Sequence, residues 1–241
     1  MRLERKLSFY EKYIKRILDV VCSLLFIIAF CWLYAIIAMI VRVKMGSPVL
    51  FKQPRPGIIK HDKETIFDMY KFRSMTDAKD ANGNLLPDDE RLSKFGAMLR
   101  STSLDELPEV FCILKGDMSV IGPRPQLVRD MVFMSDEQRM RHTAKPGLTG
   151  LAQVRGRNAV TWEEKLDWDL KYIEKVSFLG DVRILFETVA VVLKRSGITD
   201  GENATALDYG DALLKAGKAT IEEYDMLQAQ ARILIKEHER G

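Results

Sequence analysis

The chain has 241 residues, of which 47% are hydrophobic and 29% are charged, which suffices for one compact domain of ordinary size with an appendage. Its formal net charge of +3 is too balanced for a protein that acts mainly on nucleic acid, and its hydrophobic content excludes disorder. Three unpatterned cysteines exclude a disulfide scaffold and are typical of reduced thiols in a protein that faces the cytosol.

The first predicted element is an apolar segment near the N-terminus. Residues 20–41 carry no charge, and as a helix at about 1.5 Å per residue they extend roughly 33 Å, enough to cross a bilayer. The segment is too long for a secretory signal and lacks a small-residue cleavage site. Its two flanks are both basic, which favours a re-entrant segment that enters and leaves by one face. The absence of Pro and Gly from 20–41 favours a single spanning helix instead, so both topologies stay open.

Short strands and helices are predicted for residues 48–195. Residues 48–53 and 65–72 are typical of two strands that pair as a hairpin, and the stretch 53–57, rich in Pro and Gly, is predicted to be a turn. After a polar loop, 77–87, helices are predicted at 88–99, 104–114, 126–134 and 136–142. An irregular stretch, 145–158, then precedes helices at 162–176 and 178–195. Ser135 with Gln138, and Thr161 with Glu164, have the spacing of capping boxes.

The last segments complete the expected architecture. Acidic and basic residues interrupt the helix at 178–195, so it is not a second span; we expect it in the core, with partial membrane contact as the alternative. Residues 200–241 predict an amphipathic helical hairpin that docks on the main body or on another copy, with self-association as its expected role. The expected fold class is α+β and mostly helical: a membrane-anchoring helix (1–47), a compact cytosolic domain with a small β-hairpin and membrane-surface helices (48–199), and the C-terminal hairpin (200–241).

Candidate chemistry begins with a pair of adjacent carboxylates. The chain has no P-loop, no dinucleotide-binding glycine motif, no zinc spacing and no serine nucleophile elbow. Asp105 and Glu106 stand side by side near a predicted helix start. The plainer interpretation is that they complement the helix dipole, with Ser103 and Glu106 as a capping box.

Basic residues form the second group of candidates. Pro123 and Pro125 flank Arg124, so the backbone there is stiff, and a rigidly held arginine suits bidentate binding of a phosphate. The alternative is a turn with a solvated arginine. Lys71, Arg73 and Arg157 are further candidate anion ligands, each weak alone. Together these residues predict a polyanionic substrate beside a membrane.

In this order, the blocks of sequence resemble the bacterial sugar transferases called monotopic phosphoglycosyl transferases. The resemblance runs from about residue 15 to residue 197, and several blocks in register are more specific than any one motif. The blocks that carry it are 15–19, 53–57, 70–75, 103–106, 115–125, 146–150, 153–158 and 194–197.

The resemblance implies an activity and a location. Such enzymes move a phospho-sugar from a UDP-sugar to a polyprenyl (undecaprenyl) phosphate at the bacterial inner membrane and release UMP, the first membrane step of glycoconjugate synthesis. The catalytic domain would face the cytosol, where UDP-sugars are. The expected partners are the UDP-sugar, the polyprenyl phosphate, the membrane and a second copy of the chain, with no nucleic acid.

The resemblance also assigns roles to residues. Asp105 is implied as the nucleophile that forms an aspartyl phospho-sugar, and Glu106 as a ligand of Mg²⁺. Repulsion between anions is the main barrier, which Mg²⁺ and basic side chains would offset. The implied phosphate and substrate ligands are Arg124, Lys71, Arg100 and Arg73, and Gln153, Arg157 and Asp169 are implied in nucleotide binding or structure.

One departure from the family and two other functions bear on these expectations. The family's membrane helix commonly carries a Ser-Pro pair at its middle that makes it re-entrant, whereas this chain has Cys31 and Trp32 there. The first alternative function is a membrane-anchored glycosyltransferase that passes on the bare sugar and releases UDP. The second is a non-catalytic membrane-bound binding protein, against which the intact Asp105–Glu106 pair argues.

Overall fold

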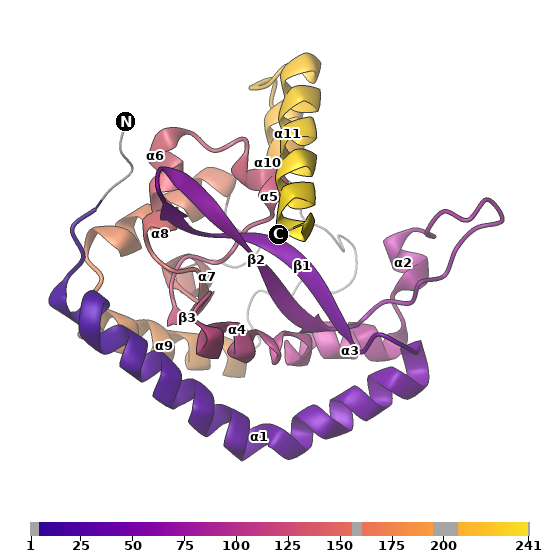
Figure 1. The fold of residues 1–241 in the computed structure, drawn as a ribbon, viewed down its shortest axis with the longest axis horizontal. Helices are drawn as coiled ribbons and strands as arrows, with labels where there is room; N and C mark the ends of the chain where they lie inside the picture. The colour runs from indigo at the N-terminus through magenta and orange to yellow at the C-terminus, as the bar shows by residue number, and fades with distance from the viewer. Residues whose placement is uncertain (1–4, 156–160, 195–206, 241) are drawn as a thin grey trace.

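The computed structural model describes residues 5–155, 161–194 and 207–240. A long N-terminal helix, a β-hairpin, a helical domain and a C-terminal pair of helices follow one another along the chain (Figure 1), which confirms the α+β, mostly helical fold class. After a helical turn at Tyr10–Ile14, the first elements are α1 (Lys15–Met45), β1 (Leu50–Lys60), β2 (Lys63–Phe72), α2 (Asp88–Arg91), α3 (Lys94–Ser101), a 3-10 turn (Leu104–Glu106), α4 (Glu109–Lys115) and β3 (Ser119–Ile121). The others are α5 (Val128–Met131), α6 (Asp136–Arg139), a 3-10 turn (Met140–Thr143), β4 (Gly147–Thr149), α7 (Leu151–Arg155), α8 (Trp162–Glu174), α9 (Phe178–Leu193), α10 (Tyr209–Lys215) and α11 (Ile221–Arg240).

Helix α1 is bent near its middle, and the rest of the domain lies on its concave side (Figure 1). The N-terminal arm is fixed by polar contacts: the buried carboxylate of Asp19 accepts hydrogen bonds from the Ser119 hydroxyl (3.0 Å) and the Val120 N–H (2.9 Å). Arg16 donates to two carbonyls in the last turn of α4, those of Ile113 and Leu114, at 2.6 and 2.7 Å. Because a helix leaves its last carbonyls unpaired, these bonds cap α4 while they hold α1.

The C-terminal arm packs on the same domain through an apolar face. Ile37 and Val41, one helical turn apart, are buried against Phe72 of β2 and Leu99 of α3. The Tyr34 hydroxyl donates to the carbonyl of Leu107 at 2.7 Å. Residues 28–32, between the two arms, are all exposed. Both ends of the apolar helix are therefore attached to one domain, and its middle projects from that domain.

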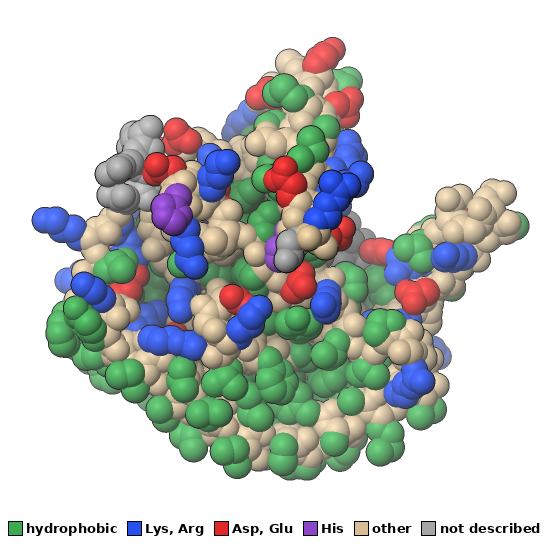
Figure 2. Space-filling model, viewed as in Figure 1, with side chains coloured by type: hydrophobic (Ala, Val, Ile, Leu, Met, Phe, Trp, Pro, Cys, Tyr) green, Lys and Arg blue, Asp and Glu red, His purple; other side chains and the backbone are tan. Residues whose placement is uncertain are grey.

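Exposed apolar side chains line much of α1. Figure 2 shows hydrophobic side chains covering the face along α1, while most Lys and Arg side chains in this view lie above it. Helix α9 adds to the exposed apolar side chains, with Leu179 78% and Phe186 71% exposed. Only Asp181 and Ile184 of α9 are buried, so the expectation that this segment lies in the core is wrong. Its apolar residues occupy most of its circumference, and the domain covers just one narrow stripe of them.

The β-hairpin forms, but its turn lies elsewhere than predicted. Strands β1 and β2 are antiparallel, with Pro54 opposite Asp68 and Pro56 opposite Ile66, so residues 53–57 belong to a strand. A strand of a two-stranded sheet has an unpaired edge, where proline's missing N–H is tolerated. The turn is made by His61 and Asp62, whose φ angles of 51° and 61° are left-handed.

Other elements differ in their limits from the predictions. Ser93 caps α3 by accepting from the Gly96 N–H, which splits the helix predicted at 88–99. Both capping boxes predicted at Ser135 and Thr161 are confirmed. Strands β3 and β4, which were not predicted, form a parallel ladder that pairs Ser119 with Gly147 and Ile121 with Thr149. A Cβ atom on Gly147 would lie 2.1 Å from the backbone nitrogen of Gly122, so this close approach requires glycine.

The C-terminal helices dock on the main body of the same chain. Ala231 of α11 is buried against Val128 and Met131 of α5. Tyr209 of α10 packs on Leu166 of α8, and its N–H donates to the Asp130 carboxylate at 2.9 Å. Docking on the body is one of the two predicted outcomes; self-association stays a prediction.

Candidate functional site

The carboxyl pair lies on a tight turn between α3 and α4. Ser103 has left-handed backbone angles (φ 54°, ψ 19°), which are strained for a residue with a side chain, and the 3-10 turn that follows holds Asp105 and Glu106. Ser103 makes no capping hydrogen bond, so the capping box predicted there is wrong. Pro108 then starts α4 and separates it from the turn. The chain thus directs two adjacent carboxylates to one place instead of using them to cap a helix.

Glu106 is held by two cations. Its Oε1 atom accepts from Lys71 Nζ at 2.8 Å and from Arg124 Nη2 at 2.6 Å. Burial alone would raise the pKa of Glu106, but Arg124 and Lys71 outweigh it and hold that pKa well below its usual range. Both bonds use Oε1, and Oε2 makes no hydrogen bond to any residue that the structure describes.

Asp105 is buried, and apart from its own backbone N–H no residue in the described part of the chain donates a hydrogen bond to its carboxylate. Burial raises the pKa of Asp105, Lys71 opposes that change, and the neighbouring Glu106 adds to it. Arg100 also acts on this carboxyl through its charge, while its Nε atom bonds the buried Ser74 hydroxyl at 2.9 Å. An unpaired carboxylate with a raised pKa is a stronger nucleophile than a solvated one.

Sequence reasoning missed two members of this cluster. Glu109 is buried and lies 3.3 Å from Lys71 Nζ, so that one lysine serves two carboxylates. Burial and the charge of Glu106 raise the pKa of Glu109. Arg55 lies next to Arg124, and burial and Arg124 lower its pKa to about 10. A repeated pattern could have identified Arg55, because it stands in a second Pro-Arg-Pro triplet at 54–56.

Three other predicted ligands lie apart from the carboxyl pair. Arg73 is buried and donates to the carbonyls of Met45 and Pro48, both at 3.1 Å, so it closes the end of α1 and its role as a substrate ligand is not supported. Asp169 is fully buried and pairs with Arg141 at 2.6 Å, which is a structural role. Gln153 lies in α7 with a buried amide, and Arg157 lies outside the described residues.

The residues fit a magnesium ion that is bound chiefly through its substrate. The described residues contain no group of three or more His, Cys, Asp or Glu side chains arranged as a metal site. Mg²⁺ in phosphoryl-transfer sites is bound by one or two carboxylates together with substrate phosphates and water. The free Oε2 atom of Glu106 offers one such carboxylate ligand.

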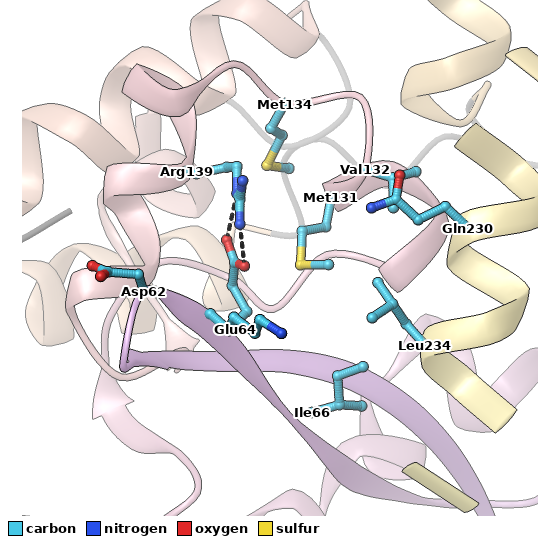
Figure 3. A pocket seen from close by; sticks show the side chains of 10 residues that line it. Asp62, Glu64, Ile66, Met131, Val132, Met134, Arg139, Gln230 and Leu234 are labelled. Atoms are coloured by element: carbon cyan, nitrogen blue, oxygen red, sulfur yellow. Dashed lines mark hydrogen bonds and ion pairs between the residues drawn. The ribbon is translucent and has the colours of Figure 1, made fainter. Parts of the chain in front are cut away.

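A separate pocket of about 430 Å³ lies between β2, α5 and α11. Figure 3 shows Glu64 and Arg139 paired on its wall opposite Leu234, with the methionine side chains between. Behind the wall, Nδ1 of the buried His142 lies 3.3 Å from Glu64. None of the carboxyl pair or its basic partners lines this pocket.

The pair of Glu64 and His142 makes stability depend on pH. Burial, followed by Arg141, lowers the pKa of His142 to about 4, although Glu64 opposes this. In the unfolded chain His142 binds its proton at about pH 6.5. The contribution of neutral His142 to the free energy of unfolding is therefore full above that pH and is lost as the pH falls towards 4, by up to about 3 kcal/mol. We expect the midpoint of thermal unfolding in detergent to fall over this range in the wild type and to fall less in His142→Gln. Equal slopes for the two proteins would contradict the expectation.

The fold and site define a class of protein: a domain seated on a bent apolar helix, with a carboxyl pair surrounded by basic residues. The sequence model described as "Bacterial sugar transferase" matches residues 10–195, and the chain belongs to this family.

Named relatives place the chain within that family. It is 44% identical over 193 residues to "Uncharacterized sugar transferase EpsL" of Bacillus subtilis, a match that covers 80% of this chain and 94% of EpsL. It is 36% identical to "Undecaprenyl-phosphate galactose phosphotransferase" of Salmonella typhimurium, over 78% of this chain and 42% of that protein. It is 39% identical to "UDP-glucose:undecaprenyl-phosphate glucose-1-phosphate transferase" of Klebsiella pneumoniae, over 73% of this chain and 39% of that protein. The chain thus spans less than half the length of the latter two.

Proposed function

We propose that the protein transfers a phospho-sugar from a UDP-sugar to undecaprenyl phosphate at the inner membrane. The observation that carries the proposal is a buried, unpaired Asp105 carboxylate next to a Glu106 that Lys71 and Arg124 clamp. Two relatives support the same reaction class by their names, one an undecaprenyl-phosphate galactose phosphotransferase and the other a UDP-glucose:undecaprenyl-phosphate glucose-1-phosphate transferase.

The side chains suggest a reaction in two transfers. The Asp105 carboxylate attacks the sugar-linked phosphorus, the bond from that phosphorus to the bridging oxygen breaks, and UMP leaves with the electron pair. The aspartyl phosphate keeps the energy of the broken anhydride, and the phosphate of the lipid then displaces Asp105. Arg124 is 41% exposed and uses one nitrogen for Glu106, so its other N–H groups can bind the phosphate oxygens.

We propose Mg²⁺ as the cofactor, held by Glu106 through Oε2. When bound, the ion would neutralise charge that develops on the phosphate oxygens. Lys71 keeps Glu106 ionised whether or not substrate is present, because its Nζ bonds the Oε1 atom.

The test uses purified protein, Mg²⁺ and a panel of UDP-sugars without a lipid acceptor. We expect a stoichiometric burst of UMP together with an increase in intact mass equal to one phospho-sugar. The sugar that gives the burst identifies the donor. Release of UDP that requires lipid would favour the bare-sugar glycosyltransferase, and donor binding without any product would favour the non-catalytic alternative.

We further propose that α1 is re-entrant, so that both of its ends lie on the cytosolic side. Asp19 in one arm and Val41 in the other both pack on the same domain. A straight spanning helix would carry one arm away from that domain. At the exposed middle, the indole N–H of Trp32 donates to the backbone carbonyl of Ala29 at 3.1 Å, so this polar group has a partner within the helix.

Cysteine labelling tests this topology. In a variant whose native cysteines are replaced by serine, single cysteines at the exposed positions Lys6 and Lys44 would be treated with a membrane-impermeant maleimide. We expect neither position to react in intact cells and both to react after lysis. Labelling of the Lys6→Cys position alone in intact cells would show a spanning helix.

A further inference from the structure

Among the residues that the structure describes, the backbone of the triplet 123–125 is anchored through its carbonyl groups. The carbonyl of Pro123 accepts from the Gly147 N–H at 2.9 Å. The carbonyl of Arg124 accepts from Arg141 Nη2 at 2.5 Å, and that of Pro125 accepts from Arg55 Nη1 at 3.0 Å. Proline has no N–H, so this triplet has a single backbone donor and cannot be fixed by an ordinary ladder. Two of its three anchors are therefore arginine side chains that are distant in sequence.

Arg141 is itself fixed on every side. It is 1% exposed, and its Nε and Nη2 atoms bond the Asp169 carboxylate at 2.9 and 2.6 Å. Its Nη1 atom lies 3.2 Å from Nε2 of His142. A guanidinium can only donate, so Nε2 of His142 accepts and the imidazole proton sits on Nδ1, towards Glu64. A planar group held at three edges is a rigid support for the carbonyl that it bonds.

Arg55 supports the neighbouring carbonyl from the hairpin side. Its Nη2 atom donates to the Gln53 side chain at 2.6 Å, while Nη1 donates to Pro125. Arg55 stands in the Pro-Arg-Pro triplet of β1, so the two Pro-Arg-Pro triplets of the sequence meet in space. The hairpin and the α8 side of the domain thus hold the same three residues from two directions.

We infer that Arg55 and Arg141 are positioning residues that aim the guanidinium of Arg124 at Glu106 and at the substrate phosphate; the phosphate part of this role rests on the proposed function. Arg124 has a long side chain that is 41% exposed, and free rotation would let its guanidinium occupy many positions. Fixing the backbone of Arg124 from two sides limits the range of those positions and keeps the 2.6 Å bond to Glu106. Electrostatic stabilisation of a transition state requires such donors to be in place before the reaction.

The first test does not depend on turnover. Phenylglyoxal modifies accessible arginines, and peptide mass spectrometry gives its rate at Arg124. Arg141→Lys and Arg55→Lys keep the charge but replace the fork by a single-point donor. We expect the rate at Arg124 to rise severalfold in both variants. Arg16→Lys is the matched control, because Arg16 also donates to two carbonyls, at 2.6 and 2.7 Å, but on α4; there the rate at Arg124 stays that of the wild type.

Kinetics give the second test. We expect kcat for UMP release to fall about 10–100-fold in Arg141→Lys, with little change in KM. The double variant Arg141→Lys with Arg124→Ala should have the same kcat as Arg124→Ala alone, because both changes act through Arg124. In the double variant Arg16→Lys with Arg124→Ala, the factors by which the two single changes alter kcat should multiply. If Arg141→Lys does not fold, Arg55→Lys carries both tests.

An unchanged modification rate at Arg124 in both lysine variants, or multiplicative kinetics for Arg141→Lys with Arg124→Ala, overturns the inference. A wild-type protein that releases no UMP from any donor overturns the proposed function instead, and the modification rates still decide whether the two arginines position Arg124.

Discussion

Asp105→Asn is expected to lower UMP release by at least about 10⁴-fold and to abolish the phospho-sugar adduct, because the amide cannot form an acyl phosphate. The same variant is expected to be more stable than the wild type at neutral pH. Burial raises the pKa of Asp105, so the ionised carboxylate is disfavoured in the folded protein, and that cost grows as the pH rises from the unfolded pKa through the folded one. A neutral asparagine removes the cost.

The combination of lost activity with a higher unfolding midpoint separates a nucleophile from a structural residue, whose loss lowers both. Asp225→Asn, on the exposed side of α11, is the matched control and should change neither property. Substantial residual turnover in Asp105→Asn, or a mass adduct that persists, would remove Asp105 as the nucleophile. A lower unfolding midpoint would contradict the view that its burial is unfavourable.

Local sequence patterns predicted the elements whose cause is local. A charge-free run predicted α1, and the spacing of Ser135 and Thr161 with their partners predicted two capped helix starts. Where the cause is tertiary, the predictions failed. Ser103 has capping-box spacing, but its backbone is left-handed and its side chain makes no capping hydrogen bond. Residues 53–57 have turn composition, but pairing with β2 extends them.

The residues of the candidate site also separate into those marked by local sequence and those brought in by the fold. The Asp105–Glu106 pair and Arg124 could be singled out because their own neighbours in sequence are unusual. Glu109 could not, since it matters only through Lys71, which the fold brings to it. For Arg55 the repeated Pro-Arg-Pro triplet is a signal in the sequence, but its contact with the carbonyl of Pro125 is made by the fold. Arg73 shows the converse: it stands in a promising block of sequence, but its guanidinium bonds the carbonyl at the end of α1.

Arg124→Ala is expected to lower kcat for UMP release by about 10²–10³-fold, the usual effect of removing one charged donor from a phosphoryl-transfer site. The variant also removes one of the two cations that keep Glu106 ionised. The pKa of Glu106 should therefore rise, and the acidic limb of the pH–rate profile should move to higher pH. Arg124→Lys, which keeps the charge but not the fork, should fall between the wild type and Arg124→Ala in both properties.

Arg129→Ala is the matched control for this experiment. Arg129 is 49% exposed, against 41% for Arg124, and it likewise pairs with one carboxylate, Asp208 at 2.5 Å. Its loss should leave kcat and the pH profile unchanged, since an exposed ion pair contributes little to stability. If Arg124→Ala leaves kinetics unchanged, the phosphate role fails. If it lowers kcat without moving the acidic limb, Lys71 alone suffices to keep Glu106 ionised, and Arg124 acts on the substrate only.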